Sequence, residues 1–598
     1  MTDKRHRTSK PRPPDALKGG LAETSHSPSF GSALGRAFRG TIIRSILATV
    51  LFVAVFLITT KAWKLNIYSP LTYWGDALEM ASYMGRDYVF NDLRERFFAP
   101  FGVDHATSLR YVVNFLLQPN STLFLLAYSV TRDTVAALNL YYLSTFPLAF
   151  LSAYWVYGRL KLADPFRVGS ATLYALMPFH FQSGVVHLME SSYFLVPILA
   201  YALVLVFRAR PYFHAYSDGA WRWSWRDKQD WFWLGLMVFL SSLNEYHQLF
   251  FMMLLPVAAV IASVQHRNHR ILGGAAVLLT AAGLSTIAKM ILNRLLSEPG
   301  LELSIIGTPI SGYGEAEIYG LKMIQIILPA SGHHLEYFRL IRRTYEAAHV
   351  VNENGAVALG LFGAVGFIYL MMRGVYSIAR RTLKVGILDV AALLAFACVA
   401  IATIGGVASL VATIGDLLFG PQSILTQIRC YNRIIVFIGF FSYYAASVLL
   451  AGVVFRIIAY LRIRRNANLL ASLVSLPLFG VALWDQVPFK IANSPGESAR
   501  YASDREFFAE VERQLAPRAL VFQCPFNIHH ADVNQSGNSP YNYADGIRPY
   551  LNSRTLRFTY GSDDGSPQLG WLEKTSQLPT ERMVERLCEF GFSGIVVH

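Results

Sequence analysis

Two acidic residues early in the chain, Asp76 and Glu79, have the types and spacing that proton transfer requires. They lie three residues apart in the motif YWGDALE, and therefore on one face if this stretch is helical. A carboxylate just outside a membrane segment is suited to take the proton of an acceptor hydroxyl, and such general-base catalysis contributes about 10²- to 10⁴-fold in rate. We predict a catalytic role for both residues. Solvated loop acids are the alternative interpretation.

Further polar residues stand where later apolar segments end. The motifs FHFQSGVVHLMESS and LNEYHQLFF contain His187, Glu190, Asn244, Glu245 and His247. A charged group at the centre of a bilayer costs about 2.5 to 3.5 kcal/mol on insertion scales, so such residues tend to line a polar cavity. We predict that Glu245 and His247 belong to the active site and that the other three line its cavity. A helix end at the membrane interface is the alternative, because it escapes most of that cost.

Cationic and histidine residues offer a site for an anion. The motif QIRCYNRI sets Arg429 and Arg433 four residues apart, on one helical face. Two guanidinium groups there suit a lipid phosphate, although anchoring to ordinary anionic headgroups explains them equally well. Lys322, His333 and His334 lie in a long polar loop that we expect to close over the site. The two histidines are adjacent and no HExxH motif accompanies them, which disfavours a zinc site.

The composition indicates which elements must position these residues. The 598 residues are 53% hydrophobic and only 15% charged, with a mean hydropathy of +0.35, and these values indicate a polytopic membrane protein rather than a soluble one. The net charge is +14, but many of the Lys and Arg residues lie in short loops between apolar runs, as the positive-inside rule predicts, so nucleic acid is not an expected partner. The chain lacks a P-loop, a GxSxG motif and a Rossmann glycine pattern, and its predicted cytoplasmic loops lack DxD, which together disfavour nucleotide chemistry.

The apolar runs predict about eleven transmembrane helices, each close to the length that spans a bilayer. The predicted spans are residues 42–60, 134–157, 168–186, 191–207, 231–246, 247–264, 271–290, 356–372, 387–404, 434–455 and 468–484. Residues 109–130 and 405–431 are apolar as well, but counting either as a crossing would move basic loops to the outside. We predict that both are re-entrant or interfacial.

Three domains follow from this topology. Residues 1–40 are a disordered basic cytoplasmic tail, and residues 41–486 are the transmembrane module with outer loops 63–108 and 293–355. Residues 487–598 alternate predicted helices with strands, which indicates a small α/β domain on the extracytoplasmic or periplasmic side. The sequence leaves open whether Cys524 and Cys588 of this domain form a disulfide or remain two thiols.

Taken together, the anchor helix, the acidic first outer loop, the many spans and the α/β tail resemble the GT-C superfamily of integral membrane glycosyltransferases. The motifs YWGDALE, FFAPFGVD, LNEYHQLFF, NENGAVALG, IRCYNRI and RPYLNSRTLRFTYG are similar to those of bacterial membrane proteins described as sugar transferases. The resemblance implies an inner-membrane enzyme of cell-envelope polysaccharide biosynthesis that uses a polyprenyl-phosphate-linked sugar donor. In the family, a first-loop carboxylate is a base or a metal ligand, a role carried here to Asp76 and less directly to Glu79. This chain has the more widely spaced Asp76 and Glu79 in place of the family's usual paired acidic motif. Dependence on Mg²⁺ or Mn²⁺ therefore stays open.

The implied reaction is an inverting displacement at the sugar's anomeric carbon, with a glycan or lipid as the acceptor. Asp76 would take the acceptor's proton, and Arg429, Arg433 or Lys322 would stabilise the departing lipid phosphate. Two alternative functions are a transporter or flippase for a lipid-linked sugar and a non-catalytic cell-envelope assembly protein. A large outer loop and a folded outer domain are less expected of a transporter.

Overall fold

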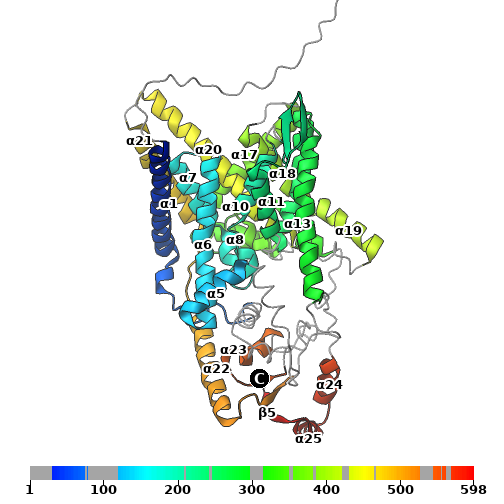
Figure 1. Cartoon of the computed structure of the whole chain (residues 1–598). Helices are drawn as coiled ribbons and strands as arrows, with labels where there is room; N and C mark the ends of the chain where they lie inside the picture. Colours follow the sequence, from blue (N-terminus) through cyan, green and yellow to red (C-terminus); the bar gives the residue numbers. More distant parts are fainter. Residues whose placement is uncertain are drawn as a thin grey trace, which may run out of the picture. The chain divides into compact units, whose positions relative to one another are not determined.

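The structure, a computed structural model, is shown in Figure 1. It describes residues 30–74, 77, 119–207, 211–240, 245–295, 314–348, 354–380, 386–420, 430–463, 466–525, 543–553, 555–559 and 567–597. The chain divides into two compact units, Met1–Val50 and Leu51–His598. Helix α1 (Phe30–Thr60) begins in the first unit, and the remaining elements belong to the second.

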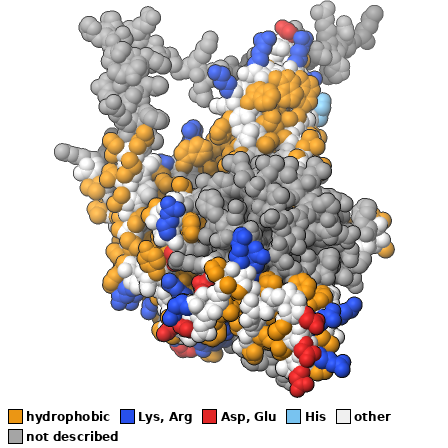
Figure 2. Space-filling view, turned by 60° about the horizontal axis from the view of Figure 1, so that its bottom comes forward, with side chains coloured by type: hydrophobic (Ala, Val, Ile, Leu, Met, Phe, Trp, Pro, Cys, Tyr) orange, Lys and Arg blue, Asp and Glu red, His pale blue; other side chains and the backbone are white. Residues whose placement is uncertain are grey.

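Seven helices within the described residues are long and apolar enough to cross a membrane. They are α1, α6 (Thr134–Arg159), α12 (Glu245–His266), α13 (Arg270–Leu295), α17 (Gly360–Arg380), α20 (Ile435–Tyr460) and α21 (Ala467–Gln486). Large apolar side chains remain exposed along these helices, and Figure 2 shows hydrophobic side chains over much of the described surface that it draws. Such a surface suits a lipid environment. The chain is therefore a helical polytopic membrane protein.

The remaining predicted spans are shorter than expected or interrupted. The apolar helices α10 (Val196–Val206) and α18 (Ile387–Ala402) have fewer than eighteen residues, as does the described helix α11 (Lys228–Leu240). Helix α19 (Val407–Phe419) is also short, and it lies in the segment 405–431 that was predicted to be re-entrant or interfacial. The predicted span 168–186 is instead α7 (Asp164–Ala175) followed by α8 (Pro178–Ser183).

Local chemistry accounts for this break in the predicted span 168–186. Pro178 stands at the first position of α8, where its missing N–H is tolerated but where it cannot continue a preceding helix. Gly184 ends α8 with φ +54°, a backbone conformation that glycine adopts readily. A further short helix, α9 (Leu188–Ser191), follows before α10. The result is a stretch of turns and short helices inside an otherwise apolar bundle.

Helix α20 is the most buried of the seven spans, since 78% of its apolar window is buried. It packs closely against α17, α18, α7 and α21. The phenol of Tyr443 in α20 donates to the Leu359 carbonyl at 3.0 Å and to Oε1 of Gln486 at 2.8 Å, and such polar contacts stabilise helix pairs inside a bilayer. A short 3-10 helix, η3 (Tyr431–Ile434), leads directly into α20 and so lies near the bundle interior.

Smaller elements connect the spans. They are η1 (Ala62–Lys64), α5 (Pro119–Thr131), the hairpin β1 (His214–Ser217) and β2 (Ala220–Trp223), α14 (Glu315–Ile318), α15 (Met323–Ile327), α16 (Glu336–Ala348) and η2 (Asn354–Val357). The predicted re-entrant segments are described in part. Helix α5 covers the end of the first, and α19 covers much of the second.

The C-terminal residues form a small α/β arrangement. Its elements are α22 (Pro495–Gln514), β3 (Leu520–Cys524), η5 (Tyr543–Ile547), α23 (Arg548–Asn552), β4 (Arg557–Phe558), α24 (Pro567–Ser576), α25 (Thr580–Phe590) and β5 (Phe592–Val597). The strands form one parallel sheet in the order β4-β3-β5. Cys398, Cys524 and Cys588 are free thiols, with Cys588 exposed and Cys524 partly buried.

Candidate functional site

A cavity of about 470 Å³ lies in the second unit, and short elements rather than long spans form its wall. Interrupted helices produce polar cavities within membrane proteins, because their free backbone groups and polar side chains need an environment other than lipid. The cavity is lined by Phe179, Gln182 and Ser183 of α8, His187, Ser331, Glu346 of α16, Gly355 and Ala356 of η2, and Asn432 and Arg433 of η3.

Arg433 places a positive charge at this cavity. Its Nη1 lies 2.6 Å from Oε1 of Glu190 in α9, and the two side chains are only 7% and 12% exposed. A buried charge is tolerated when an opposite charge and hydrogen bonds compensate for the lost hydration. The ion pair thus allows a guanidinium group to remain in the wall of a cavity inside an apolar bundle.

Two side-chain amides add polar groups to the same wall. Asn432 is 1% exposed, and its Oδ1 has no hydrogen-bond partner among the described residues. The Oε1 of Gln182 likewise has no partner in that part of the chain, whereas its Nε2 donates to Oγ of Ser331. A buried acceptor without a partner costs about 1–3 kcal/mol. A ligand that carries hydroxyl groups would remove that cost.

The structure gathers four of the residues that the sequence singled out. His187 lines the cavity at the start of α9, and Glu190 is paired with Arg433. His247 stands in the first turns of α12, is 5% exposed, and lies close enough to Arg433 for the guanidinium charge to act on its ring. These residues come from three separate parts of the sequence and meet where α9, α12 and η3 approach one another.

Lys322, His333 and His334 are not among the lining residues. His333 is fully buried; its Nδ1 accepts from the Leu335 N–H at 3.0 Å, so its Nε2 carries the proton and donates to Asp485 at 3.1 Å. His334 stacks on a tryptophan ring. Partial burial lowers the pKa of Lys322, whose ammonium group is 3.5 Å from a backbone carbonyl oxygen. The contacts of these three residues are therefore with groups that do not line the cavity.

Asp76, Glu79, Asn244 and Arg429 lie outside the described residues, and only the backbone of Glu245 is described, at the start of α12. Their roles therefore stay predictions. Within the described ranges, no three His, Cys, Asp or Glu side chains are grouped closely enough to hold a metal ion.

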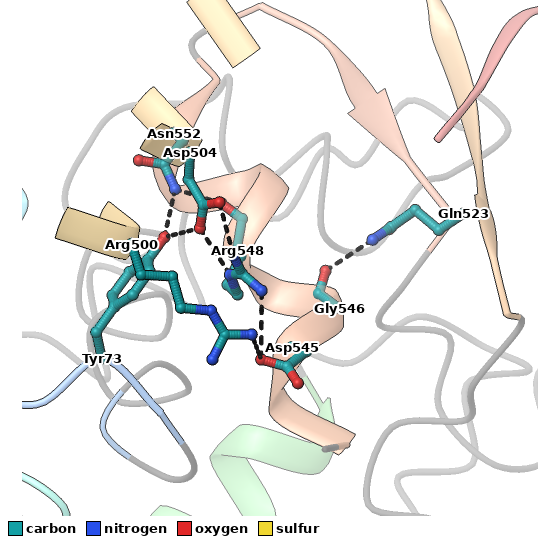
Figure 3. Close-up of polar contacts among 8 residues, drawn as sticks. All are labelled: Tyr73, Arg500, Asp504, Gln523, Asp545, Gly546, Arg548 and Asn552. Atoms are coloured by element: carbon teal, nitrogen blue, oxygen red, sulfur yellow. Dashed lines mark hydrogen bonds and ion pairs between the residues drawn. The ribbon is translucent and has the colours of Figure 1, made fainter. Parts of the chain in front are cut away.

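A second polar group of residues, which we call the junction cluster, joins the segment that follows α1 to the C-terminal α/β elements. It consists of Tyr73, Arg500, Asp504, Asp545, Arg548 and Asn552 (Figure 3). Arg548 donates from Nε and Nη2 to the two oxygens of Asp504, each at 2.6 Å. Tyr73 donates its O–H to Oδ2 of Asp504 at 2.7 Å and accepts from Nδ2 of Asn552 at 2.7 Å. Figure 3 shows Tyr73 reaching from the loop toward these groups.

Apolar packing surrounds the junction cluster. The Tyr73 ring is 1% exposed and meets the ring of Tyr501 edge-on at 5.2 Å, within a core that also contains Val135 of α6 and Phe508 of α22. Burial, together with the adjacent Asp504 carboxylate, raises the pKa of Tyr73 far above its ordinary value, so the phenol stays protonated and acts as a donor. Tyr73 is therefore held both by hydrogen bonds and by apolar packing.

Sequence reasoning missed several residues of both sites. Asn432 lies within the motif IRCYNRI and Gln182 within FHFQSGVVHLMESS, but the site residues predicted from these two motifs were limited to their arginine, histidine and glutamate residues. Tyr73 opens the motif YWGDALE, yet nothing in the sequence indicated its partner Asp504, which lies 431 residues away. Only the folded chain brings them together.

Comparisons with known proteins give few matches. No protein-family model and no curated protein sequence match this chain. Among solved structures, the chain is similar to the Archaeoglobus fulgidus oligosaccharyltransferase, crystallised as a complex with Zn and sulfate, with a TM-score of 0.32 and 13% sequence identity. The alignment covers 87% of this chain and 62% of that one, so this chain spans less than two thirds of that protein.

Proposed function

We propose that this protein is a membrane glycosyltransferase of the bacterial inner membrane. It moves a sugar from a polyprenyl-phosphate donor to a glycan or lipid acceptor on the extracytoplasmic side. The observation that carries the proposal is the guanidinium group of Arg433 at the wall of a polar cavity inside an apolar helical bundle. An amphipathic ligand with an anionic head and a long hydrocarbon tail fits such a location.

The lining of the cavity supports a sugar phosphate as the ligand. Its volume of about 470 Å³ falls within the 300–1,000 Å³ that is usual for small-molecule sites. Arginine suits phosphate oxygens because its planar fork of N–H donors matches their geometry. The oxygens of Asn432 and Gln182 are acceptors for sugar hydroxyl groups.

The proposed reaction is a single displacement at the anomeric carbon. Asp76 removes the proton of the acceptor hydroxyl, whose oxygen forms the new bond to that carbon. The bond from the carbon to the phosphate oxygen breaks, and the lipid phosphate leaves with the electron pair. Arg433 stabilises the negative charge that develops on the phosphate. Attack from the face opposite the leaving group inverts the anomeric configuration.

Other residues have supporting roles in this proposal. Arg429 and Lys322 add positive charge for the donor, and Glu245 and His247 orient the acceptor. Glu79 is a second candidate for the base. The C-terminal domain binds the glycan or another acceptor. The sequence resemblance supports only the roles of Asp76 and Glu79, and mutation of each residue tests the assignments separately.

The decisive test compares the wild-type protein with the Asp76→Asn variant. Purified protein in proteoliposomes is incubated with radiolabelled polyprenyl-phosphate sugars and a membrane glycan extract, and transfer to the glycan is measured. We expect the wild type to transfer label and Asp76→Asn to lose at least about 10²-fold in rate, because the general base is removed. The matched control is Asp218→Asn, which makes the same change at an exposed carboxylate in the β1–β2 turn.

Three results would oppose the proposal. Full activity of Asp76→Asn, and of Glu79→Gln in turn, would remove the two acids of the YWGDALE motif as the base. Movement of the labelled donor across the bilayer without transfer would favour a transporter. Neither transfer nor transport, with the donor still bound, would favour an assembly protein.

A further inference from the structure

Two ion pairs reach the cavity, and each presents one of its two members to it. Arg433 lines the cavity, whereas its partner Glu190 does not. Glu346 of α16 also lines the cavity, whereas its partner Arg342, four residues earlier in the same helix, does not. The described wall of the cavity therefore carries the cation of one pair and the anion of the other.

Arg342 holds the Glu346 carboxylate in place. The guanidinium group is 1% exposed and donates from Nε to Oε1 of Glu346. It also donates from Nη1 to the Pro329 carbonyl at 3.3 Å and from Nη2 to the Gly355 carbonyl at 3.1 Å. Because Gly355 is itself a lining residue, one buried guanidinium group ties α16 to η2 at the wall. A carboxylate fixed in this way loses little conformational entropy when a ligand binds.

The second carboxylate oxygen of Glu346 is accessible to a ligand. Oε2 has no hydrogen-bond partner among the described residues, and the side chain is 31% exposed. An ionised carboxylate only accepts hydrogen bonds. Oδ1 of Asn432 and Oε1 of Gln182 are further acceptors of the same cavity that have no partner in the described ranges. Three such acceptors require a ligand with several donors, which the hydroxyl groups of a sugar supply.

We propose that Glu346 binds the hydroxyl groups of the donor sugar while Arg433 binds its phosphate, so that the cavity selects an uncharged sugar. This rests on the proposed function, in which the donor is a lipid-linked sugar phosphate. A sugar hydroxyl donates to Oε2 of Glu346, and others donate to the oxygens of Asn432 and Gln182. A uronic acid is rejected, because its carboxylate repels Glu346 and cannot donate to these acceptors.

The binding test compares the wild type with Glu346→Gln, which removes the charge and keeps the size of the side chain. The probes are farnesyl phosphate and its glucosyl, galactosyl and mannosyl derivatives, and calorimetry measures their dissociation constants for the detergent-solubilised protein. We expect the wild type to bind at least one hexosyl probe more tightly than farnesyl phosphate. Glu346→Gln should weaken that probe by about 10- to 100-fold, the contribution of a hydrogen bond to a charged group, and leave farnesyl phosphate unchanged.

The matched control is Glu336→Gln in the same helix. Glu336 also pairs with an arginine, Arg339, but is 67% exposed and does not line the cavity, so its dissociation constants should equal those of the wild type. Unchanged constants in Glu346→Gln, or an equal loss for farnesyl phosphate, would overturn the proposal. A wild type that binds no hexosyl probe more tightly than farnesyl phosphate would overturn it as well.

The charge of the probe gives a readout that a purely structural role of Glu346 would not move. The uronic acid that corresponds to the preferred hexose should bind the wild type at least about 10-fold more weakly than that hexose. Glu346→Gln should narrow this difference, because the repulsion between like charges is removed. A wild type that prefers the uronic acid, or a variant that loses the same factor for both probes, would contradict the proposal.

A double variant guards against a loss that comes only from misfolding. Glu346→Gln leaves the buried Arg342 without its carboxylate, which destabilises the fold. Arg342→Gln combined with Glu346→Gln removes both charges and should unfold at a higher temperature than Glu346→Gln alone. The preferred hexosyl probe should still bind the double variant about 10- to 100-fold more weakly than the wild type. Wild-type affinity in the folded double variant would refute the role of Glu346.

The transfer assay separates failure of this proposal from failure of the proposed function. Loss of hexosyl binding in Glu346→Gln, with no transfer by the wild type, would retain the sugar site and reject the glycosyltransferase. Transfer with the same KM for the donor in the wild type and in Glu346→Gln would retain the glycosyltransferase and reject the sugar site.

Discussion

The Arg433–Glu190 ion pair is the residue-level feature on which the candidate site depends. Both side chains are largely buried and 2.6 Å apart, although they are 243 residues apart in the chain. Breaking a buried ion pair by removing one partner costs about 3–5 kcal/mol, because the remaining charge is left uncompensated. Replacing both partners by neutral groups avoids that cost, so stability and function can be tested separately.

We predict that Glu190→Gln and Arg433→Gln each lower the stability of the detergent-solubilised protein by about 3 kcal/mol, and that the double variant recovers most of this loss. Activity should remain lost in the double variant, because the positive charge at the cavity is absent. Thermal unfolding and the transfer assay are the two measurements. An active double variant would contradict the role given to Arg433.

The pair Arg373–Asp389 provides the matched control for this comparison. It joins α17 to α18 with a 2.7 Å contact and does not line the cavity. Because Arg373 is 32% exposed, solvent screens its charge, and the control should lose less stability than the buried pair. Arg373→Gln should leave transfer per folded molecule unchanged.

At the scale of the elements, the approach of α17 to α20 depends on a glycine. A Cβ at Gly366 of α17 would lie 2.0 Å from the Ser442 carbonyl oxygen of α20, far inside contact distance. Small residues allow membrane helices to approach this closely, and their packing replaces the hydrophobic driving force that lipid does not supply. Gly366 therefore sets the α17–α20 distance, and with it the position of η3.

We predict that Gly366→Ala lowers the stability of the folded protein by about 1–3 kcal/mol, the usual cost of forcing an extra methyl group into a packed core. The loss should appear as a lower midpoint of thermal unfolding in detergent. The control is Gly452→Ala in α20, where an added Cβ meets nothing within 4 Å. Equal midpoints for the two variants would contradict the role of Gly366.

The sequence predicted the long spans well but not the interrupted ones. Apolar length is sufficient to recognise α12 and α20, because a bilayer requires about twenty apolar residues in succession. Hydropathy does not register that, within one predicted span, Pro178 begins the new helix α8 after α7 and Gly184 ends it. In the C-terminal domain, the helix and strand patterns lie where α22 and β3 are found, because their periodicities are local.

The candidate site was harder to predict because it is formed by interrupted helices, whose packing a local pattern does not reveal. Residue type indicated that Arg433, Glu190 and His247 were unusual in an apolar region. Their grouping depends on how interrupted helices pack, which is a long-range property of the chain. His333 shows the limit of residue type, because its bond to Asp485 gives it a structural role that its sequence context does not reveal.

At the scale of the whole molecule, the distribution of charge predicts a topology. Basic residues concentrate in the loops that the positive-inside rule places in the cytoplasm, including the one that contains the β1–β2 hairpin. With an odd number of crossings, the C-terminal domain lies on the opposite side. The proposed reaction needs this arrangement, since Tyr73 and Asp504 are in contact and must share one side of the membrane.

We predict that a membrane-impermeant maleimide labels Cys588 in intact spheroplasts, because this thiol is exposed and the charge pattern predicts an extracytoplasmic location for residues 487–598. The control is Ser217→Cys in a Cys588→Ser background, at an exposed position of the hairpin, which should react only after lysis. Cys398 and Cys430 are buried and should stay unmodified in both preparations. Labelling of Ser217→Cys in intact spheroplasts, with Cys588 protected until lysis, would invert the topology. Asp76 and the C-terminal domain would then face the cytoplasm, and a reaction with extracytoplasmic acceptors would be ruled out.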